Sequence, residues 1–473
     1  MVMPCSTPAA QGVDGRGLLA LLDAAETPGH GYHSLMIARH GHVIAEGWWA
    51  PYARDRVHLG YSLSKSFTAT VLGSLVGRGL IDLDVPVLSY LTELRSVPPA
   101  WRRVTVRDCV TMTVGHTTDI WDWRGDAAPA PQQPDEPDPL LPLILEREPD
   151  GEPGQVWAYN QVGPYLVAQA IAAVTGQPLS AHLRRELLDP FGGADARAQR
   201  TLGGRDLGFS GLCVTTPAIL ALAQTWLDGG VWQGRRIVPA EFAEQAPRPT
   251  SASLASDDVG DWSHGYGYSF WRSSHGYRGD GAFGQFALVL PEQDVAVAIT
   301  SETEAMQDVL DQVWRHLLPA IDTQPDPQAD VQLARRLAGL EHPPLSGSTR
   351  RSAAPALRDP ASQLPATYRS AALEVSTDGH HRLRIDHPAA ELVTEIGDGC
   401  WLESRWPTPS GPDLALAASG AWRDGVFVAQ LRLVETPHTI LLELDPASGT
   451  ALLNWRLIPL TGPDPLQAAA FPI

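Results

Sequence analysis

The first part of the chain carries a strand-like and then a helix-like pattern of apolar residues. Residues 33–49 contain two apolar runs on either side of His40-Gly41, which predicts a β-hairpin with its turn at these two residues. From Ser62 to Val76 the apolar residues recur at intervals of three and four, the spacing of one helix face, and Gly79 follows as a natural C-cap. The pattern therefore predicts a hairpin followed by a helix that begins near Ser62.

Further helices and strands continue the same domain. Apolar spacing predicts helices over residues 165–174 and 216–227, and strands over residues 285–290 and 295–300 joined by a Pro-Glu-Gln-Asp turn. Residues 127–139 are rich in proline and aspartate and are predicted to form a loop or lid. Strands at both ends with helices between them indicate an α+β domain.

The pattern changes after residue 322. Residues 323–365 form a Pro/Asp/Gln-rich stretch that is predicted to be a linker with one short helix near residues 331–340. Beyond it, apolar and polar residues alternate with the period of a strand, and turn residues recur about every ten positions. We therefore predict a first domain over residues 1–322, the linker, and a β-rich C-terminal domain over residues 366–473.

Composition narrows the class of protein. A chain of 473 residues with 44% apolar and 19% charged residues suits two or three globular domains. The net charge of −19 disfavours nucleic acid and anionic membranes as partners. No segment reaches the ~18 uninterrupted apolar residues that span a bilayer. Residues 1–12 lack the charged and apolar regions of a signal peptide, so a cytoplasmic location is expected.

The basic residues are distributed unusually. Of the 35 lysine and arginine residues, only Lys65 is a lysine. A preference for arginine codons explains the arginines but not the one position that remained lysine. Arginine keeps its proton in proteins, whereas a buried lysine can lose it near neutral pH. Lys65 is therefore a candidate proton acceptor, and the alternative is a surface lysine retained by chance.

The helix that begins near Ser62 places two candidate catalytic groups together. Ser62 and Lys65 are three residues apart, so their side chains share a helix face. A serine hydroxyl becomes a good nucleophile when a neighbour takes its proton, and a neutral lysine amine can do so. The N-terminus of a helix also stabilises a developing oxyanion. The alternative interpretation is an ordinary helix start with a serine N-cap.

Two further segments carry candidate site residues. Tyr159 lies in the loop that precedes residues 165–174, and an adjacent ammonium is expected to lower the pKa of its phenol and make it a base. Glycines are frequent in residues 277–285, which allows the backbone to approach a ligand closely. The main-chain N–H groups of Ala282 and Ser62 are predicted to form an oxyanion hole. The alternatives are a packed tyrosine and a bulged strand corner.

The chain carries three motifs in order: Ser62-x-x-Lys65, Tyr159-Asn160-Gln161 and the glycine-rich segment. Together they resemble the motifs of the serine β-lactamase and penicillin-binding-protein superfamily, in particular its class C and family VIII esterase branch. The likeness extends from about residue 33 to residue 317 and includes Leu-Asp-Val-Pro-Val-Leu-Ser-Tyr-Leu at residues 83–91.

The resemblance implies a β-lactamase/transpeptidase-like domain, with an antiparallel sheet flanked by helices and a helical lobe. It also implies an acyl-enzyme mechanism with Ser62 as the nucleophile, Lys65 as the proton acceptor and Tyr159 as the general base.

Two positions depart from the family motifs. Gln161 stands where the family has Asn or Ser, and Gly279 stands where it has Lys or His, so that only Gly281 remains in register. Asn160, Gln161, Gly279 and Gly281 are the candidate substrate-binding residues. A cation at position 279 would hold a substrate carboxylate, and the side chain of Arg278 is expected to point to the other face of the strand. The departure favours an esterase or small-amide hydrolase.

The remaining histidines do not indicate a metal site. His40 and His42 fall in the predicted hairpin turn, and His380 and His381 lie among polar turn residues. The segment Thr111–His116 is also similar to a family motif, so His116 and Asp119 are candidates to line the cleft, although a turn role is favoured for both. We expect no metal and no cofactor.

The sequence therefore favours a metal-independent serine hydrolase that acts on a small ester or amide through an acyl-enzyme on Ser62. The alternative enzyme is a β-lactamase or a D-amino-acid peptidase or carboxypeptidase. The alternative from another class is a catalytically inactive binding protein of the same fold. The expected partner is a small molecule rather than nucleic acid or a membrane, and the oligomeric state stays open.

Overall fold

The computed structural model describes residues 3–120, 140–193, 195–201, 203–348, 354–357, 368–375, 380–408 and 412–467. The predicted loop over residues 127–139 lies outside these ranges. The chain forms two compact units: the first comprises Met1–Gly47, Gly60–Ala338 and Pro472–Ile473, and the second comprises Trp48–Leu59 and Gly339–Phe471. Each is described by itself. Among the described residues, no helix has the length and apolar character needed to cross a membrane.

The first unit is built on a six-stranded sheet with the order β2-β1-β11-β10-β9-β8. Its strands are β1 (Tyr32–Arg39), β2 (His42–Trp48), β8 (Trp271–Arg272), β9 (Tyr277–Gly281), β10 (Gln285–Leu290) and β11 (Val295–Ser301). Four neighbouring pairs are antiparallel: β1 with β11, β11 with β10, β10 with β9, and β9 with β8. The predicted hairpin and the two later strands are confirmed, and the hairpin turn has His40 at φ 51° and Gly41 at φ 70°.

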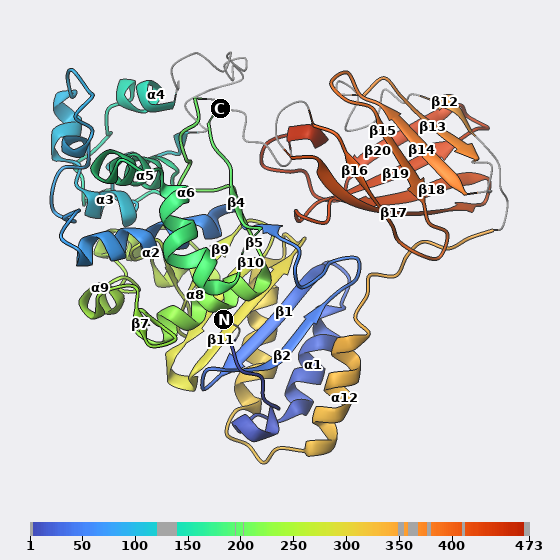
Figure 1. Cartoon of the computed structure of the whole chain (residues 1–473), viewed down its shortest axis with the longest axis horizontal. Helices are drawn as coiled ribbons and strands as arrows, with labels where there is room; N and C mark the ends of the chain where they lie inside the picture. Colours follow the sequence, from blue (N-terminus) through green and yellow to red (C-terminus); the bar gives the residue numbers. More distant parts are fainter. Residues whose placement is uncertain are drawn as a thin grey trace. The chain divides into compact units, whose positions relative to one another are not determined.

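Helices cover both faces of this sheet, as the complete burial of β1, β10 and β11 requires. α8 (Thr216–Leu227) packs against β1, β10 and β11. α1 (Gly15–Ala25) packs against α12 (Pro327–Ala338) and the π-helical turn η9 (Val313–Leu317), as Figure 1 shows for α1 and α12. The helix predicted near residues 331–340 is thus α12, and it belongs to the first unit.

A helical lobe completes the first unit and supplies the segment that carries Ser62. The predicted helix start is a 3-10 turn, η2 (Tyr61–Leu63), which leads into α2 (Ser64–Gly77). α2 packs against α5 (Val162–Thr175), and α5 packs against α3 (Val106–Val110). The remaining elements of this unit are α4 (Leu140–Glu146), α6 (Leu179–His182), η6 (Leu183–Leu188), α7 (Asp189–Phe191), β4 (Arg197–Ala198), β5 (Leu212–Val214), β6 (Val231–Trp232), β7 (Arg235–Arg236), α9 (Ala240–Gln245), α10 (Ser251–Leu254), η7 (Gly260–His264) and α11 (Met306–Gln312), with short 3-10 turns between them.

The second unit consists of two antiparallel sheets, so the predicted β-rich C-terminal region is confirmed. One sheet contains β12 (Ala354–Leu357), β13 (Ser370–Val375), β14 (His381–Asp386) and β15 (Leu392–Ile396). The other contains β16 (Leu402–Trp406), β17 (Leu414–Arg423), β18 (Val426–Arg432), β19 (Thr439–Asp445) and β20 (Thr450–Trp455). Buried residues alternate with exposed ones along β15 and with half-buried ones along β14 and β20, and the buried set forms one core that includes Trp406 and Phe427. Because apolar side chains fill one face only, the sequence shows the period of two.

Candidate active site

Ser62 lies on a tight turn that the surrounding backbone holds in place. The preceding residue, Tyr61, has φ 47°, in the left-handed region that a bulky side chain rarely adopts. The Ser64 hydroxyl donates to the carbonyl of Tyr61 at 2.6 Å and accepts the N–H of Leu212 at 3.0 Å. The N–H of Gly60 donates to the carbonyl of Leu212 at 2.9 Å. These bonds fix the turn, and Ser62 at its apex is partly exposed.

The amine of Lys65 lies against the Ser62 hydroxyl, as the helical spacing predicts. Its Nζ atom is 3.0 Å from Ser62 Oγ, 2.6 Å from Gln161 Oε1 and 2.9 Å from the carbonyl oxygen of Phe209. The residue is only 1% exposed. Burial lowers the pKa of Lys65 from 10.5 to about 7, although the charges of Asp119 and Asp280 raise it. A large share of Lys65 is therefore neutral at neutral pH and able to accept a proton.

Asp119 joins the site through Gln161. Its carboxylate accepts the main-chain N–H of Gln161 and the side-chain Nε2–H of the same residue, each at 3.0 Å. The second bond turns the amide so that its oxygen faces Lys65. The sequence favoured a turn role for Asp119 over a place in the cleft, and its link to Gln161 was not predicted because the contact joins residues 42 positions apart.

Tyr159 contacts the same hydroxyl from another side. Its phenol interacts with the side chain of Ser62, and its ring centroid lies 4.8 Å from the Lys65 Nζ atom. The ring stacks on Trp271 at 5.5 Å and meets Tyr266 edge-on at 5.8 Å. The prediction that the neighbouring ammonium lowers the phenol pKa is wrong. Burial, followed by the charge of Asp280, raises the pKa of Tyr159, and its interaction with Ser62 only partly opposes this.

Asn160 is placed differently from the prediction. The residue is fully buried, and its Nδ2 atom donates to the carbonyl of Ala158 at 2.7 Å. Its Oδ1 atom accepts the N–H groups of Val162 and Gly163 at 3.0 and 3.4 Å. Asn160 therefore satisfies donors at the start of α5, and the predicted substrate contact is not supported by this arrangement.

The glycines of β9 allow the strand to lie directly against the segment that carries Ser62. A Cβ atom at Gly281 would lie 2.0 Å from the main-chain oxygen of Gly60, and one at Gly279 would lie 2.5 Å from Ser66 Oγ. Close approach is the role that glycine serves here. Ala282 follows Gly281 directly, so its backbone lies near the turn of Ser62. The pairing of the Ala282 and Ser62 N–H groups as an oxyanion hole stays a prediction.

Arg278 and Asp280 project from the opposite face of β9. Arg278 is fully buried, and its Nε–H donates to Asp280 Oδ2 at 3.0 Å while Nη1 donates to Ser273 Oγ at 2.6 Å. Trp262 Nε1–H donates to the same Asp280 oxygen at 3.1 Å, and its ring lies 4.5 Å from the Arg278 guanidinium. As expected, Arg278 does not replace the family cation, because its charge is used inside the protein.

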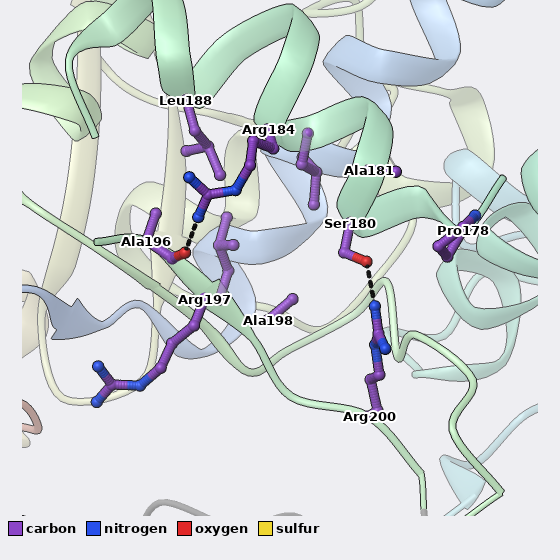
Figure 2. Close-up of a pocket in the computed structure, with 11 residues that line it drawn as sticks. Pro178, Ser180, Ala181, Arg184, Leu188, Ala196, Arg197, Ala198 and Arg200 are labelled. Carbon is purple, nitrogen blue, oxygen red and sulfur yellow. Dashed lines mark hydrogen bonds between the residues drawn. The ribbon is translucent and has the colours of Figure 1, made fainter. Parts of the chain in front are cut away.

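Other candidate groups lie elsewhere. Over the described ranges, no group of three or more His, Cys, Asp or Glu side chains is arranged to hold a metal ion. His116 packs on Trp101 at 5.4 Å between ring centroids, and its Nε2 atom is 3.2 Å from the carbonyl of Arg147. A cavity of about 450 Å³ lies between η6 and β4, where Arg184 donates to the carbonyl of Ala196 (Figure 2). None of Ser62, Lys65 and Tyr159 lines it.

Comparisons with known proteins agree with this arrangement. Residues 23–319 match the family model for Beta-lactamase. The chain is 27% identical over 239 residues to the 6-aminohexanoate-dimer hydrolase of Paenarthrobacter ureafaciens, covering 48% of this chain and 59% of that protein. It is 31% identical over 158 residues to Esterase/beta-lactamase LipL of Mycobacterium tuberculosis, covering 31% and 34%. The chain thus spans less than two thirds of the length of either relative.

A solved structure shows the same fold. The octameric penicillin-binding protein homologue from Pyrococcus abyssi superimposes with a TM-score of 0.51 at 16% identity, covering 88% of this chain and 97% of that one. The fold is β-lactamase/transpeptidase-like, with a strand-rich C-terminal region. The family match covers more than half of the chain, and it includes every side chain of the site. The chain belongs to the beta-lactamase family, and its relatives include a protein named as a hydrolase and one named as an esterase/beta-lactamase.

Proposed function

We propose that the protein is a metal-independent acyl hydrolase that cleaves small esters or amides through an acyl-enzyme on Ser62. The observation that carries the proposal is the amine of Lys65, 3.0 Å from Ser62 Oγ and with a pKa of about 7. This geometry and this basicity are what a general base for a serine nucleophile requires.

The proton movements follow from the contacts. The neutral Lys65 Nζ accepts the Ser62 hydroxyl proton while Oγ forms a bond to the substrate carbonyl carbon, giving a tetrahedral oxyanion. Tyr159 keeps its proton in the resting enzyme, because burial raises the pKa of its phenol. It can therefore donate that proton to the departing oxygen or nitrogen and recover one from Lys65. Water then attacks the ester on Ser62 with the proton transfers reversed.

The third motif supports small esters and amides over β-lactams or peptide carboxylates. Position 279 has no cation, and a side chain there would overlap Ser66 of α2. The neighbouring guanidinium of Arg278 is fully buried and bound to Asp280. A substrate carboxylate would thus lack the partner that the resemblance implies for β-lactamases. A small-molecule partner and a cytoplasmic location remain part of the proposal.

A fluorophosphonate probe tests the nucleophile. We expect one adduct in the intact-mass spectrum, mapped to the peptide of Ser62, and no adduct on Ser62→Ala. Ser89→Ala is the matched control, because Ser89 is an exposed serine whose hydroxyl donates to the carbonyl of Pro86. It should label like the wild type. A labelled Ser62→Ala, or one that still hydrolyses a 4-nitrophenyl ester at the wild-type rate, would contradict the proposal.

A second comparison separates the substrate classes. The wild type is given a neutral 4-nitrophenyl ester and a chromogenic cephalosporin under the same conditions. We expect turnover of the ester and little or none of the cephalosporin. Faster turnover of the cephalosporin would favour a β-lactamase.

A further inference from the structure

Asp280 occupies a position from which it acts on the catalytic side chains. Arg278 of β9 lies opposite Trp271 of β8, so their side chains project from the same face of the sheet. Asp280 is two residues after Arg278, and because strand side chains alternate, it projects from that face too. Trp271 stacks on Tyr159 at 5.5 Å. The charge of Asp280 also acts on Lys65 and Tyr159. The carboxylate therefore lies on the face of β9 that is shared with Trp271, the residue that stacks on Tyr159.

Among the described residues, hydrogen-bond donors reach one oxygen of Asp280. Arg278 and Trp262 both donate to Oδ2, at 3.0 and 3.1 Å. Within the part of the chain that the structure describes, Oδ1 accepts no hydrogen bond, and the residue keeps 8% of its surface exposed. A buried carboxylate gains stability from each further donor, so Oδ1 is a vacant acceptor beside the site.

The charges around the reacting groups disfavour an anionic substrate. Arg278 is fully buried, its Nη2 atom included, so a carboxylate could reach it only if the surrounding chain moved. The Lys65 Nζ atom already has three hydrogen-bond partners, and burial lowers its pKa. Asp119 and Asp280 are the carboxylates whose charges act on Lys65. A group that enters beside them meets negative rather than positive charge.

We propose that Asp280 Oδ1 accepts a hydrogen bond from an ammonium or amide N–H of the substrate, so that Ser62 acts preferentially on acyl compounds that carry an amine and discriminates against those that carry a carboxylate. This inference rests on the proposed function and names the substrate class of the same site. It reverses the charge preference that a cation at position 279 would give.

The test uses 4-nitrophenyl esters whose acyl chains end in a methyl, an ammonium or a carboxylate group, each at a short and a long chain length. We expect kcat/KM for the ammonium ester to exceed that for the carboxylate ester roughly 10- to 100-fold at one or both lengths, as one hydrogen bond to a charged group provides. The ratio should fall as salt is added. Equal values for the two charged esters, with the neutral ester hydrolysed through Ser62, would overturn the inference and leave the proposed function intact. Absence of any adduct on Ser62 would overturn both.

Variants test the residue itself. Asp280→Asn alone leaves the buried guanidinium of Arg278 without a counter-charge, so the double variant Arg278→Met/Asp280→Asn, which removes the whole pair, is the better choice. Its ammonium-to-carboxylate ratio should approach one. Asp294→Asn is a control for the loss of a carboxylate elsewhere, because Asp294 is an exposed turn residue between β10 and β11 and its replacement removes one negative charge without touching the site. It should keep the wild-type ratio. A folded double variant that also keeps the wild-type ratio would overturn the assignment to Asp280.

Discussion

The basicity of Lys65 can be measured directly because the chain contains no other lysine. Protein grown with lysine labelled at ¹³Cε and ¹⁵Nζ should give a single side-chain signal in the NMR spectrum. We expect this signal to titrate with a midpoint at about pH 7, since burial lowers the pKa of Lys65 to about 7. The same sample unfolded in urea should titrate near the ordinary value of 10.5.

The magnitude follows from the burial of the amine. A fall in pKa from 10.5 to about 7 corresponds to about 5 kcal/mol of differential free energy between the charged and neutral forms. At pH 7 about half of Lys65 is then neutral, compared with roughly one molecule in 3,000 for an unperturbed lysine. Because the neutral amine is the acceptor, kcat/KM for an ester should rise with pH through this midpoint and level off above it.

Lys65→Arg is the companion variant. Arginine keeps the positive charge but does not lose its proton, so acylation should fall by roughly a factor of 100 to 10,000, the usual contribution of general base catalysis. An NMR midpoint near 10.5 in the folded protein would refute the argument. So would a Lys65→Arg variant with the wild-type rate, because either result means that Lys65 does not act as a neutral base.

Two further variants examine the supports of the site. Asp119→Asn removes a charge that raises the pKa of Lys65, so the midpoint of the pH–rate profile and of the NMR titration should move to lower pH, with a lower kcat; an unchanged midpoint would argue against this link. Gly281→Ala should cost more stability and activity than Gly279→Ala. The first adds a Cβ atom 2.0 Å from the main-chain oxygen of Gly60, whereas the second meets a serine side chain at 2.5 Å that can rotate. In thermal unfolding, Gly279→Ala should lose ~1–3 kcal/mol of stability, the usual cost of overpacking, and Gly281→Ala should lose more. The reverse order would contradict the packing argument.

Elements with a regular pattern of apolar residues could be predicted closely from the sequence. α8 and β10 have the predicted bounds, Thr216–Leu227 and Gln285–Leu290. The residues that pack in the core are the same ones whose regular spacing marks the element in the sequence. The start of α2 was predicted less well. The turn at Tyr61 needs a backbone conformation that its side chain disfavours, and hydrogen bonds from distant residues hold it there. Local propensity contains no information about such bonds.

The same distinction separates the site residues that were predicted from those that were not. Ser62 and Lys65 are related by helix geometry, so their contact follows from their spacing. Asp119 is linked to Lys65 by hydrogen bonds through Gln161, and Asn160 turns its amide to the start of α5 rather than outward. The pKa of Tyr159 had the opposite direction from the prediction, because burial and Asp280 act on the phenol more strongly than the neighbouring amine. Burial decides the pKa of Tyr159 and a contact between distant segments decides the role of Asp119, whereas Asn160 is held by local hydrogen bonds at the start of α5.

The site combines several features that each disfavour the folded state. Below pH 7 the folded protein must bury a protonated Lys65, and this cost is relieved as the pH rises toward 10.5, since the unfolded chain then binds more protons than the folded one. Tyr61 adds a left-handed backbone conformation beside it. An arginine at position 65 would remain charged throughout, so it would bear the burial cost without supplying a base. Of the two strongly basic side chains, only lysine is converted by burial into a neutral amine that can accept a proton near pH 7. This explains why position 65 remained lysine in a chain that uses arginine for every other strongly basic side chain.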